Sequence, residues 1–437
     1  MIQIILLLLG REIIQRNWRM LLAVSIVWIL AGAFIVVDAL DGVTLIPSRF
    51  FGYLLLPEAV VSFIAAFGRQ GTARRMRFLQ SAALFTVALL ILSARPASNF
   101  ILAMLLGLCF LVDGGIRIGS AWVVRYPRWK WGLAGGIGEV LLAIATLQPW
   151  PTWYAGTVGS NVGAVMILTG AGLLMIAMRI RRLHEGASFS SLLSRNPFWH
   201  YGGKLRDDGE THTNEVIVHV WTPTGTAMTP LRRRAIERYI AAVDANGVIS
   251  TGHAALQMGD DLYISHYPAT EIDRSPEDFA RTLRATADND VPGRFLTSYE
   301  EEAAEWCPST VQVVITNIDA KRLRTFWENY RADNTYNLTN RNCSSAVANA
   351  LDAAVEGVYG KRHRRPIIAA LRAILHPELW AAALMRQRAE TMAWTPGLVL
   401  DYARALSAIV DPPTMFWDFR RFRLFKKYAG VSNQNQA

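Results

Sequence analysis

Six long apolar stretches fill the first 180 residues, and they constrain the fold more than any other feature of this sequence. They run over residues 21–37, 51–67, 78–94, 100–124, 131–147 and 158–178. Most of them reach the ~17 to 25 residues that a membrane-spanning helix requires. Hydrophobic residues make up 52% of the 437-residue chain, which is too many for an ordinary soluble protein. We therefore expect residues 1–185 to form an all-α bundle of six membrane helices.

Basic residues alternate along these stretches. They lie before the first stretch, between the second and third, between the fourth and fifth, and after the sixth: Arg11, Arg16, Arg19, Arg69, Arg74, Arg75, Arg77, Arg125, Arg128, Lys130, Arg179, Arg181 and Arg182. The other loops are nearly free of them. Because short loops rich in Lys and Arg stay in the cytoplasm, we expect both termini, and the domain that follows residue 185, to be cytoplasmic.

Charge and cysteine usage exclude several function classes. The formal net charge of +10 is concentrated in the apolar half, so it indicates topology rather than a nucleic-acid partner. Cys109, Cys307 and Cys343 form neither a disulfide framework nor a paired zinc spacing, which is typical of a reducing compartment. The sequence also has no zincin pair and no phosphate-binding Gly-Lys loop, so it implies no metal and no cofactor.

The opening residues, Met1 to Gly10, are apolar but lack the preceding basic residues and the small-residue cleavage site of a signal peptide. We expect them to form a helix that lies in the membrane interface ahead of the first span.

The spans occur in pairs that turn near Arg95-Pro96 and near Pro149-Trp150-Pro151, with glycine-rich segments such as Gly135-Gly136. With this repeat, residues 18–183 resemble the HdeD-like family of small bacterial membrane proteins named for acid resistance. The resemblance implies a location in the bacterial inner (plasma) membrane and no known chemistry.

The second half has the pattern of an α+β domain with a helical tail. Residues 186–212 look like a linker, 213–365 like the domain, and 366–437 like the tail. Within the domain the pattern predicts strands over 215–221 and 310–318, a hairpin over 254–265, and helices over 230–243, 321–330 and 343–355. Aromatic and basic residues alternate over 416–428, which suits the membrane interface; a helix packed on the domain is an equal alternative.

Two histidines and one cysteine in this half are the candidate chemical groups. If the hairpin turns at Gly259-Asp260, facing residues have numbers that sum to 519, so His253 and His266 become cross-strand neighbours. Asn342 can cap a helix that begins at Cys343. Backbone N–H groups and the helix dipole there lower the pKa of a thiol and can hold an oxyanion. The alternative is an inert buried cysteine.

These motifs carry a second resemblance. Gly252-His253-Ala254-Ala255-Leu256, then Tyr263-Ile264-Ser265-His266, then Asn342-Cys343 resemble the circularly permuted branch of the NlpC-type papain-like superfamily, which lecithin retinol acyltransferase typifies. The match covers about residues 213–358 and implies an α+β papain-like fold. It also implies that Cys343 is the nucleophile, His253 the general base and His266 the group that orients the imidazole. Tyr336 and Asn342 are candidates that help shape the site, although for Tyr336 we favour a role in the core. After the cysteine the chain departs from those enzymes, with Ser344-Ser345-Ala346.

The sequence therefore predicts a membrane-anchored, cysteine-dependent hydrolase or acyltransferase that forms an acyl-thioenzyme. Its expected partners are the lipid bilayer and a membrane-associated ester or amide; the oligomeric state is left open. Two alternatives remain: a thiol peptidase or amidase on a protein or peptidoglycan-type substrate, and a non-catalytic membrane protein of acid or envelope stress.

Three carboxylates, Glu58, Asp113 and Glu139, fall inside the expected spans, where acidic groups are functional candidates. Asp113 has Arg117 one turn later and can form an ion pair with it. Glu58 and Glu139 either line a polar path, as in a transporter, or bond across helices, and we favour the second interpretation.

Overall fold

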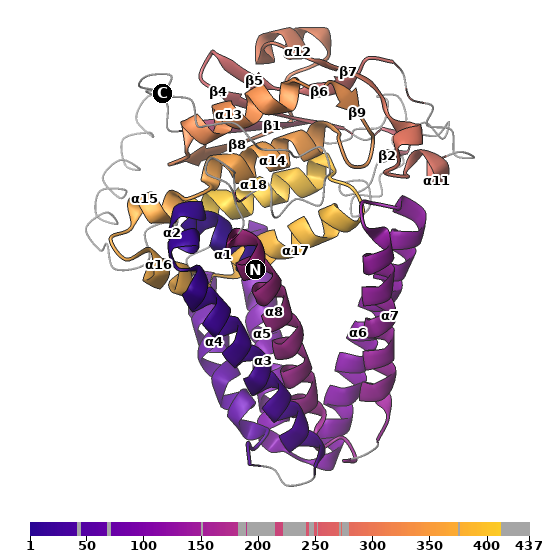
Figure 1. Ribbon diagram of the computed structural model, residues 1–437, viewed down its shortest axis with the longest axis vertical. Helices are drawn as coiled ribbons and strands as arrows, with labels where there is room; N and C mark the ends of the chain where they lie inside the picture. The colour runs from indigo at the N-terminus through magenta and orange to yellow at the C-terminus, as the bar shows by residue number, and fades with distance from the viewer. Residues whose placement is uncertain are drawn as a thin grey trace, which may run out of the picture.

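The computed structural model places a helical bundle beneath a domain of strands and helices (Figure 1). It describes residues 1–41, 45–67, 71–149, 152–181, 189, 215–221, 242–243, 249–250, 252–270, 272, 279–374 and 376–411.

Six long helices form the bundle at the predicted positions. They are α3 (Trp18–Leu40), α4 (Arg49–Phe67), α5 (Gly71–Ser93), α6 (Pro96–Val124), α7 (Trp129–Leu147) and α8 (Thr157–Arg181). Within the described residues, α3, α6, α7 and α8 are each long and apolar enough to cross a membrane. In α5 the apolar part is shorter, from Arg77 to Ser93. The structure thus shows four candidate spans, whereas the sequence predicts six.

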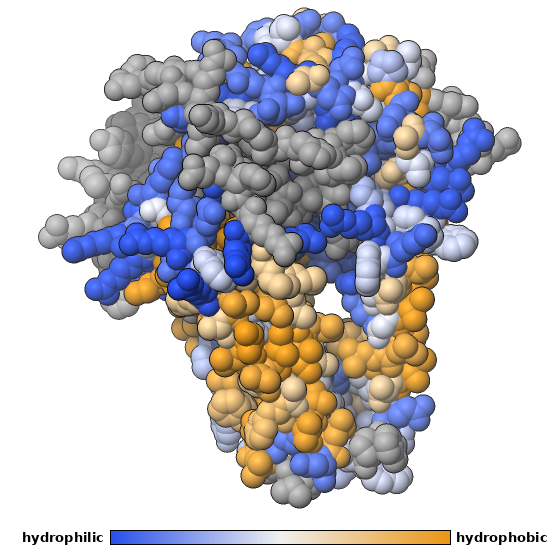
Figure 2. Space-filling model, in the orientation of Figure 1, coloured by the Kyte–Doolittle hydropathy of each residue, from blue (hydrophilic) through white to orange (hydrophobic). Residues whose placement is uncertain are grey.

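The bundle helices pack in the pairs α3 with α8, α4 with α5, and α6 with α7. Glycines allow two of these pairs to approach closely. A Cβ atom on Gly32 would lie 2.7 Å from the carbonyl oxygen of Gly163, and one on Gly114 would lie 2.9 Å from that of Gly136. Large apolar side chains such as Val27 and Leu30, both 63% exposed, cover the outside of the bundle (Figure 2). This surface is suited to lipid.

The domain is built on antiparallel strands. The main sheet has the order β5-β4-β1-β8 and contains β1 (Glu215–Trp221), β4 (His253–Met258), β5 (Leu262–Ile264) and β8 (Val311–Thr316). A second sheet has the order β6-β7-β9 and contains β6 (His266–Pro268), β7 (Val291–Phe295) and β9 (Thr335–Tyr336), and a separate pair joins β2 (Ala242–Val243) to β3 (Ile249–Ser250). The predicted strand at 215–221 is confirmed. The predicted hairpin is present, but its turn spans residues 259–261, one residue more than the predicted Gly259-Asp260 turn.

Helices cover the side of the main sheet that faces the bundle. Here α14 (Cys343–Val355) packs on β4, on α13 (Ala320–Arg331) and on α18 (Pro396–Val410), and α18 packs on β8 and β1. The remaining elements are α11 (Phe279–Thr282), η1 (Ala287–Asn289), α12 (Tyr299–Glu305), α15 (Val358–Arg362), α16 (Pro366–Ala373) and α17 (Pro377–Thr391). In Figure 1, α17 lies between the domain and the bundle.

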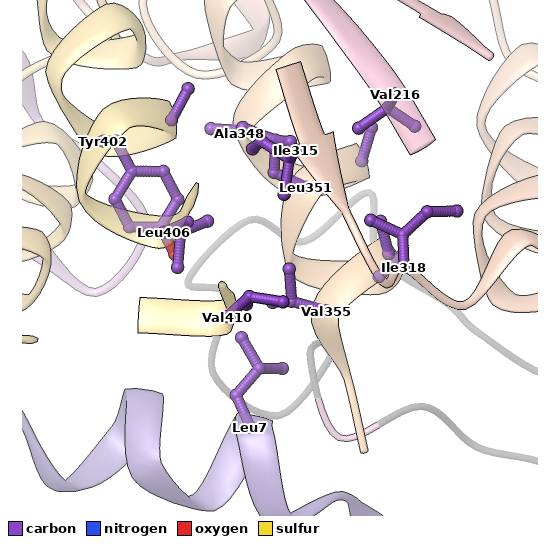
Figure 3. Packing of buried hydrophobic residues seen from close by; sticks show 14 of the residues in the cluster. Leu7, Val216, Ile315, Ile318, Ala348, Leu351, Val355, Tyr402, Leu406 and Val410 are labelled. Atoms are coloured by element: carbon purple, nitrogen blue, oxygen red, sulfur yellow. The ribbon is translucent and has the colours of Figure 1, made fainter. Parts of the chain in front are cut away.

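Of the two N-terminal helices, α1 (Ile2–Leu9) packs into the core of the domain, and α2 (Arg11–Arg16) contacts α3 and α8 of the bundle. Leu7 is fully buried and lies beside Val355 of α14 and Val410 of α18 (Figure 3). Its carbonyl accepts a hydrogen bond of 2.9 Å from the backbone N–H of Gly357. The predicted interfacial helix is therefore wrong. Apolar residues cover all sides of α1, and the core of the domain buries them more completely than an interface would.

The hydrophobic core draws on both ends of the chain. Residues of α1, α14, α16, α17 and α18 share one cluster of buried side chains, so helices of the predicted tail complete the core of the domain. Phe189, in the predicted linker, is also buried and its N–H donates to Glu356 Oε1 at 2.9 Å. The rest of the linker, residues 230–241 and the aromatic and basic segment at 416–428 lie outside the described residues. The last two residues of the helix predicted over 230–243, Ala242 and Val243, form strand β2 instead.

Candidate active site

The helix that begins at Cys343 has a well-defined N-terminal cap. Asn342 Oδ1 accepts a hydrogen bond of 2.7 Å from the Ser345 N–H, and Ser345 Oγ accepts one of 2.8 Å from the Asn342 N–H. This reciprocal capping box fixes the first turn of α14. Cys343, only 8% exposed, therefore lies at the positive end of the helix dipole.

His253, the first residue of β4, lies beside this cysteine because α14 packs on that strand. The imidazole is 3% exposed, and its interactions reach both Cys343 and Glu302. Its Nε2 lies 2.9 Å from Glu302 Oε1 and 3.0 Å from Ser265 Oγ. The structure thus arranges a thiol, an imidazole and a carboxylate in series.

Glu302 is a buried carboxylate on α12 with three hydrogen-bonding side chains around it. The hydroxyls of Tyr263 and Tyr267 donate to its two oxygens at 2.5 and 2.6 Å, and His253 is the third partner. Burial would raise the pKa of Glu302, but His253 and the two tyrosines lower it to about 2. The carboxylate is therefore ionised at neutral pH, and it supplies the negative charge that a histidinium requires.

The same network favours a thiolate and an imidazolium. Burial would lower the pKa of His253, but the sulfur of Cys343 and the carboxylate of Glu302 raise it to about 9. Burial would raise the pKa of Cys343, but the facing imidazolium lowers it, and hydrogen bonds from Ser344 and the Ala254 backbone act in the same direction. An ion pair of this kind activates a cysteine as a nucleophile near neutral pH.

The predicted orienting role of His266 does not agree with this geometry, because the hairpin register differs by one residue from the prediction. The ladder pairs Leu256 with Ile264 and Gln257 with Tyr263. Since successive strand residues point to opposite faces, this shift exchanges His266 for its neighbour Tyr267. The Tyr267 ring stacks on that of His253, with centroids 4.1 Å apart and planes 13° apart.

His266 instead lies in an aromatic environment away from the carboxylate. Its Nδ1 is 3.0 Å from the Tyr330 hydroxyl, and its ring contacts those of Phe295 and Tyr336. Burial lowers the pKa of His266 to about 3, so this ring is neutral at physiological pH. We assign it to the packing of the domain.

The two residues expected to shape the site act through structure. The side-chain amide of Asn342 donates to the carbonyls of Leu338, at 2.7 Å, and Trp394, at 3.0 Å. Both amide hydrogens are engaged, so Asn342 caps the helix and has none left for an oxyanion. Tyr336 is 4% exposed and its ring meets that of His266 edge-on, which is the core role that the sequence also allows.

Glu302 is a candidate functional residue that the sequence alone does not single out. It stands in the run Glu300-Glu301-Glu302, and such runs usually form a solvated helix face. The cap at Ser298, which accepts from the Glu301 N–H at 3.1 Å, indicates a helix start there. Nothing local indicates that only the third glutamate is buried.

Two of the three carboxylates in the bundle helices, Asp113 and Glu139, form ion pairs. The predicted pair of Asp113 and Arg117 is present at 3.6 Å, and Glu139 bonds across helices to Arg117 at 2.8 Å. Arg388 of α17 also pairs with Asp113. No ion pair recorded between described residues involves Glu58.

Within the described part of the chain, no group of three or more His, Cys, Asp or Glu side chains is arranged to hold a metal ion. Comparisons of the chain with family models, with curated proteins and with solved structures returned no match.

Proposed function

We propose that this protein is a membrane-anchored, cysteine-dependent hydrolase or acyltransferase that acts through an acyl-thioenzyme. The observation that carries the proposal is the series Cys343, His253 and Glu302, in which a buried carboxylate stabilises an imidazolium beside a cysteine at a helix N-terminus. An activated nucleophile needs an adjacent general base, and a third group that orients the base. Cys343, His253 and Glu302 are arranged in this order.

The cycle begins with the thiolate of Cys343, whose proton resides on His253. The sulfur attacks the carbonyl carbon of an ester or amide, and the backbone N–H groups of the first turn of α14 face the oxyanion that forms. His253 then donates its proton to the leaving alcohol or amine, and the acyl group remains on sulfur as a thioester. His253 next removes a proton from water or an acceptor, which attacks the thioester and releases the thiolate. Throughout, Glu302 remains ionised and holds the ring.

A cytoplasmic, inner-membrane location is part of the proposal. The basic ends of the bundle helices face the domain, as the contact of Arg77 with Glu378 illustrates at 2.5 Å. Because positively charged ends stay in the cytoplasm, this supports a domain on that side of a bacterial inner membrane. The sheet with its nucleophile helix supports a papain-like fold, and the helices at six predicted positions support six spans. A domain seated on membrane helices favours a membrane-associated ester or amide, since tethering raises the local concentration of such a substrate.

The test is labelling of the membrane-embedded protein by a thiol-directed acyl probe across pH. We expect rapid labelling of Cys343 at neutral pH, its loss in Cys343→Ala and a strong decrease in His253→Ala. Cys307→Ala is the matched control, because Cys307 is partly exposed and interacts with neither His253 nor Glu302 in the network described above.

Labelled protein is then incubated with water, alcohols and amines, and release of the acyl group distinguishes hydrolysis from transfer. A peptide-derived probe that labels much faster than a lipid-derived one would favour the peptidase alternative. Slow labelling at Cys343 that His253→Ala leaves unchanged would refute the proposed mechanism.

A further inference from the structure

Helix α17 lies between the domain and the bundle and contacts two of the membrane helices. Its Glu378 accepts two hydrogen bonds, of 2.5 and 2.6 Å, from Arg77 of α5, and its Arg388 pairs with Asp113 of α6. Asp113 precedes the end of α6 at Val124 by about three turns, or ~16 Å along the helix. Helices α16 and α17 meet at an angle of 79°, and together they have the length and apolar character of a broken span or a re-entrant loop.

The two faces of α17 have different surroundings. Leu379, Ala382 and Arg386 are buried against the domain, and Arg386 pairs with Asp352 of the nucleophile helix α14. Trp380 and Leu384 lie two turns and one turn before Arg388 and share its face. That face is directed to the bundle, because Arg388 reaches Asp113. Yet Trp380 is 46% exposed and Leu384 is 57% exposed, so the bundle leaves much of this apolar face uncovered.

The uncovered face adjoins an opening in the bundle. At the end far from the domain, Leu102 of α6 packs with Ile91 of α5 and Val158 of α8. At the end near the domain, by contrast, Ala121, Val124 and Tyr126 cluster with Trp129 and Leu133 and with Ala285 of the domain. The α6 and α7 pair therefore diverges from the other helices towards the domain. Figure 2 shows the resulting opening directly beneath the domain.

We propose that an acyl chain of a membrane lipid occupies this opening and packs against Trp380 and Leu384 beneath α17. Apolar atoms of the bundle border the opening on its lower side, and hydrophilic atoms border it on the side of the domain (Figure 2). Burial of apolar side chains in hydrocarbon is favourable, whereas water at that depth would leave them solvated. Arg388 and Asp113 belong to a network of ion pairs with Arg117 and Glu139, in which two positive and two negative charges balance. The site therefore has no net charge to attract a headgroup.

This site does not depend on the proposed chemistry. Helix α17 also contacts α14, the helix that carries Cys343, through the ion pair of Arg386 with Asp352.

The experiment uses the full chain in lipid nanodiscs with Cys109, Cys307 and Cys343 replaced by alanine, so that no catalysis takes place. A nitroxide is attached at Leu384→Cys and its collision rates with oxygen and with a water-soluble nickel chelate are measured. The controls are Leu30→Cys on the lipid-facing side of α3 and Ala332→Cys on the exposed surface of the domain. We expect Leu384→Cys to behave like Leu30→Cys, with high oxygen access and low nickel access. High nickel access, as at Ala332→Cys, would overturn the proposal.

A second measurement uses protein without a nitroxide label, so that the label cannot perturb the site. It also distinguishes lipid in the opening from lipid on the outer surface of the bundle. Wild-type protein in nanodiscs is irradiated with a phospholipid that carries a diazirine on its acyl chain, and adducts are mapped by peptide. We expect adducts on residues 377–391 that Leu384→Trp decreases severalfold, while adducts on α3 stay constant. Absence of adducts on α17, or adducts that Leu384→Trp leaves unchanged, would contradict a lipid in the opening.

Discussion

Glu302 Oε1 lies 2.9 Å from Nε2 of His253, and both side chains are almost completely buried. The carboxylate comes from α12 and the imidazole from β4, two elements that meet only in the folded domain. An ionised carboxylate in this position holds the ring and stabilises its charged form, and this relationship underlies the following predictions about the site.

Replacement of Glu302 by glutamine retains the shape of the side chain and removes its charge. The pKa of His253 then falls because a nearby opposite charge is lost, and the pKa of Cys343 rises because the facing imidazole is less often charged. We expect the labelling rate of Cys343 at neutral pH to fall about tenfold or more and its pH midpoint to move upwards. Glu300→Gln, on the exposed side of the same helix, is the control. An unchanged pH profile would mean that the carboxylate has no electrostatic role.

The ionisation of Glu302 also affects the stability of the protein in acid. Its pKa in the folded state is about 2, against an ordinary value of 4.5, so its stabilising contribution is complete above pH 4.5 and is lost as the pH falls towards 2. At about 1.4 kcal/mol per unit, that contribution is on the order of 3 kcal/mol. Thermal unfolding between pH 6 and pH 3 should show a stability gap between wild type and Glu302→Gln that narrows in acid. A gap of constant size would show that ionisation is not its cause.

Tyr267 has two separable roles, stacking on His253 and donation to Glu302. Tyr267→Phe removes only the hydroxyl, a hydrogen bond to a charged group worth about 1.5 to 3 kcal/mol. Tyr267→Leu removes the stacked ring as well. We expect labelling of Cys343 to decrease in the order wild type, Phe, Leu, as stopped-flow measurements with the acyl probe can determine. Equal rates in Phe and Leu variants would assign the whole effect to the hydroxyl.

The buried position of α1 predicts that the first residues of the chain stabilise a domain built from its second half. Leu7→Ala should lower the free energy of unfolding of the domain by about 2 to 5 kcal/mol, because it leaves a cavity beside Val355 and Val410. Hydrogen exchange of α14 and α18 in nanodiscs measures this effect. Leu30→Ala, on the lipid-facing surface of α3, should leave that exchange unchanged. If α1 lay in the membrane interface, Leu7→Ala would leave the hydrogen exchange of α14 and α18 unchanged.

Gly10 marks the closest approach between α1 and the rest of the domain. Its φ is +78°, and a Cβ atom there would lie 2.5 Å from the Cα of Gly357. Gly10→Ala should therefore destabilise the domain, by about 1 to 3 kcal/mol for the backbone conformation alone and by more for the clash. Gly119→Ala is the matched control, since a Cβ atom on Gly119 would have nothing within 4 Å of it and a helical alanine is favourable. Equal melting temperatures for the two variants would contradict the observed contact.

Local patterns in the sequence determined much of this protein. Apolar stretches of sufficient length specify the bundle helices, alternation specifies β1 and β4, and Asn342 followed by Cys343 specifies where α14 begins. Each of these signals depends on neighbours within a few residues, so it can be read along the chain.

Tertiary structure decided the rest. A shift of one residue in the hairpin exchanges His266 for Tyr267 beside His253, and the local sequence does not fix that register. Of three consecutive glutamates, only Glu302 is buried. The apolar side chains of α1 are buried in the core of the domain, whereas the sequence predicts that they lie in the membrane interface. Sequence periodicity fixes which residues form a helix or strand, whereas the identity of a distant partner depends on how complete helices and sheets pack to exclude water.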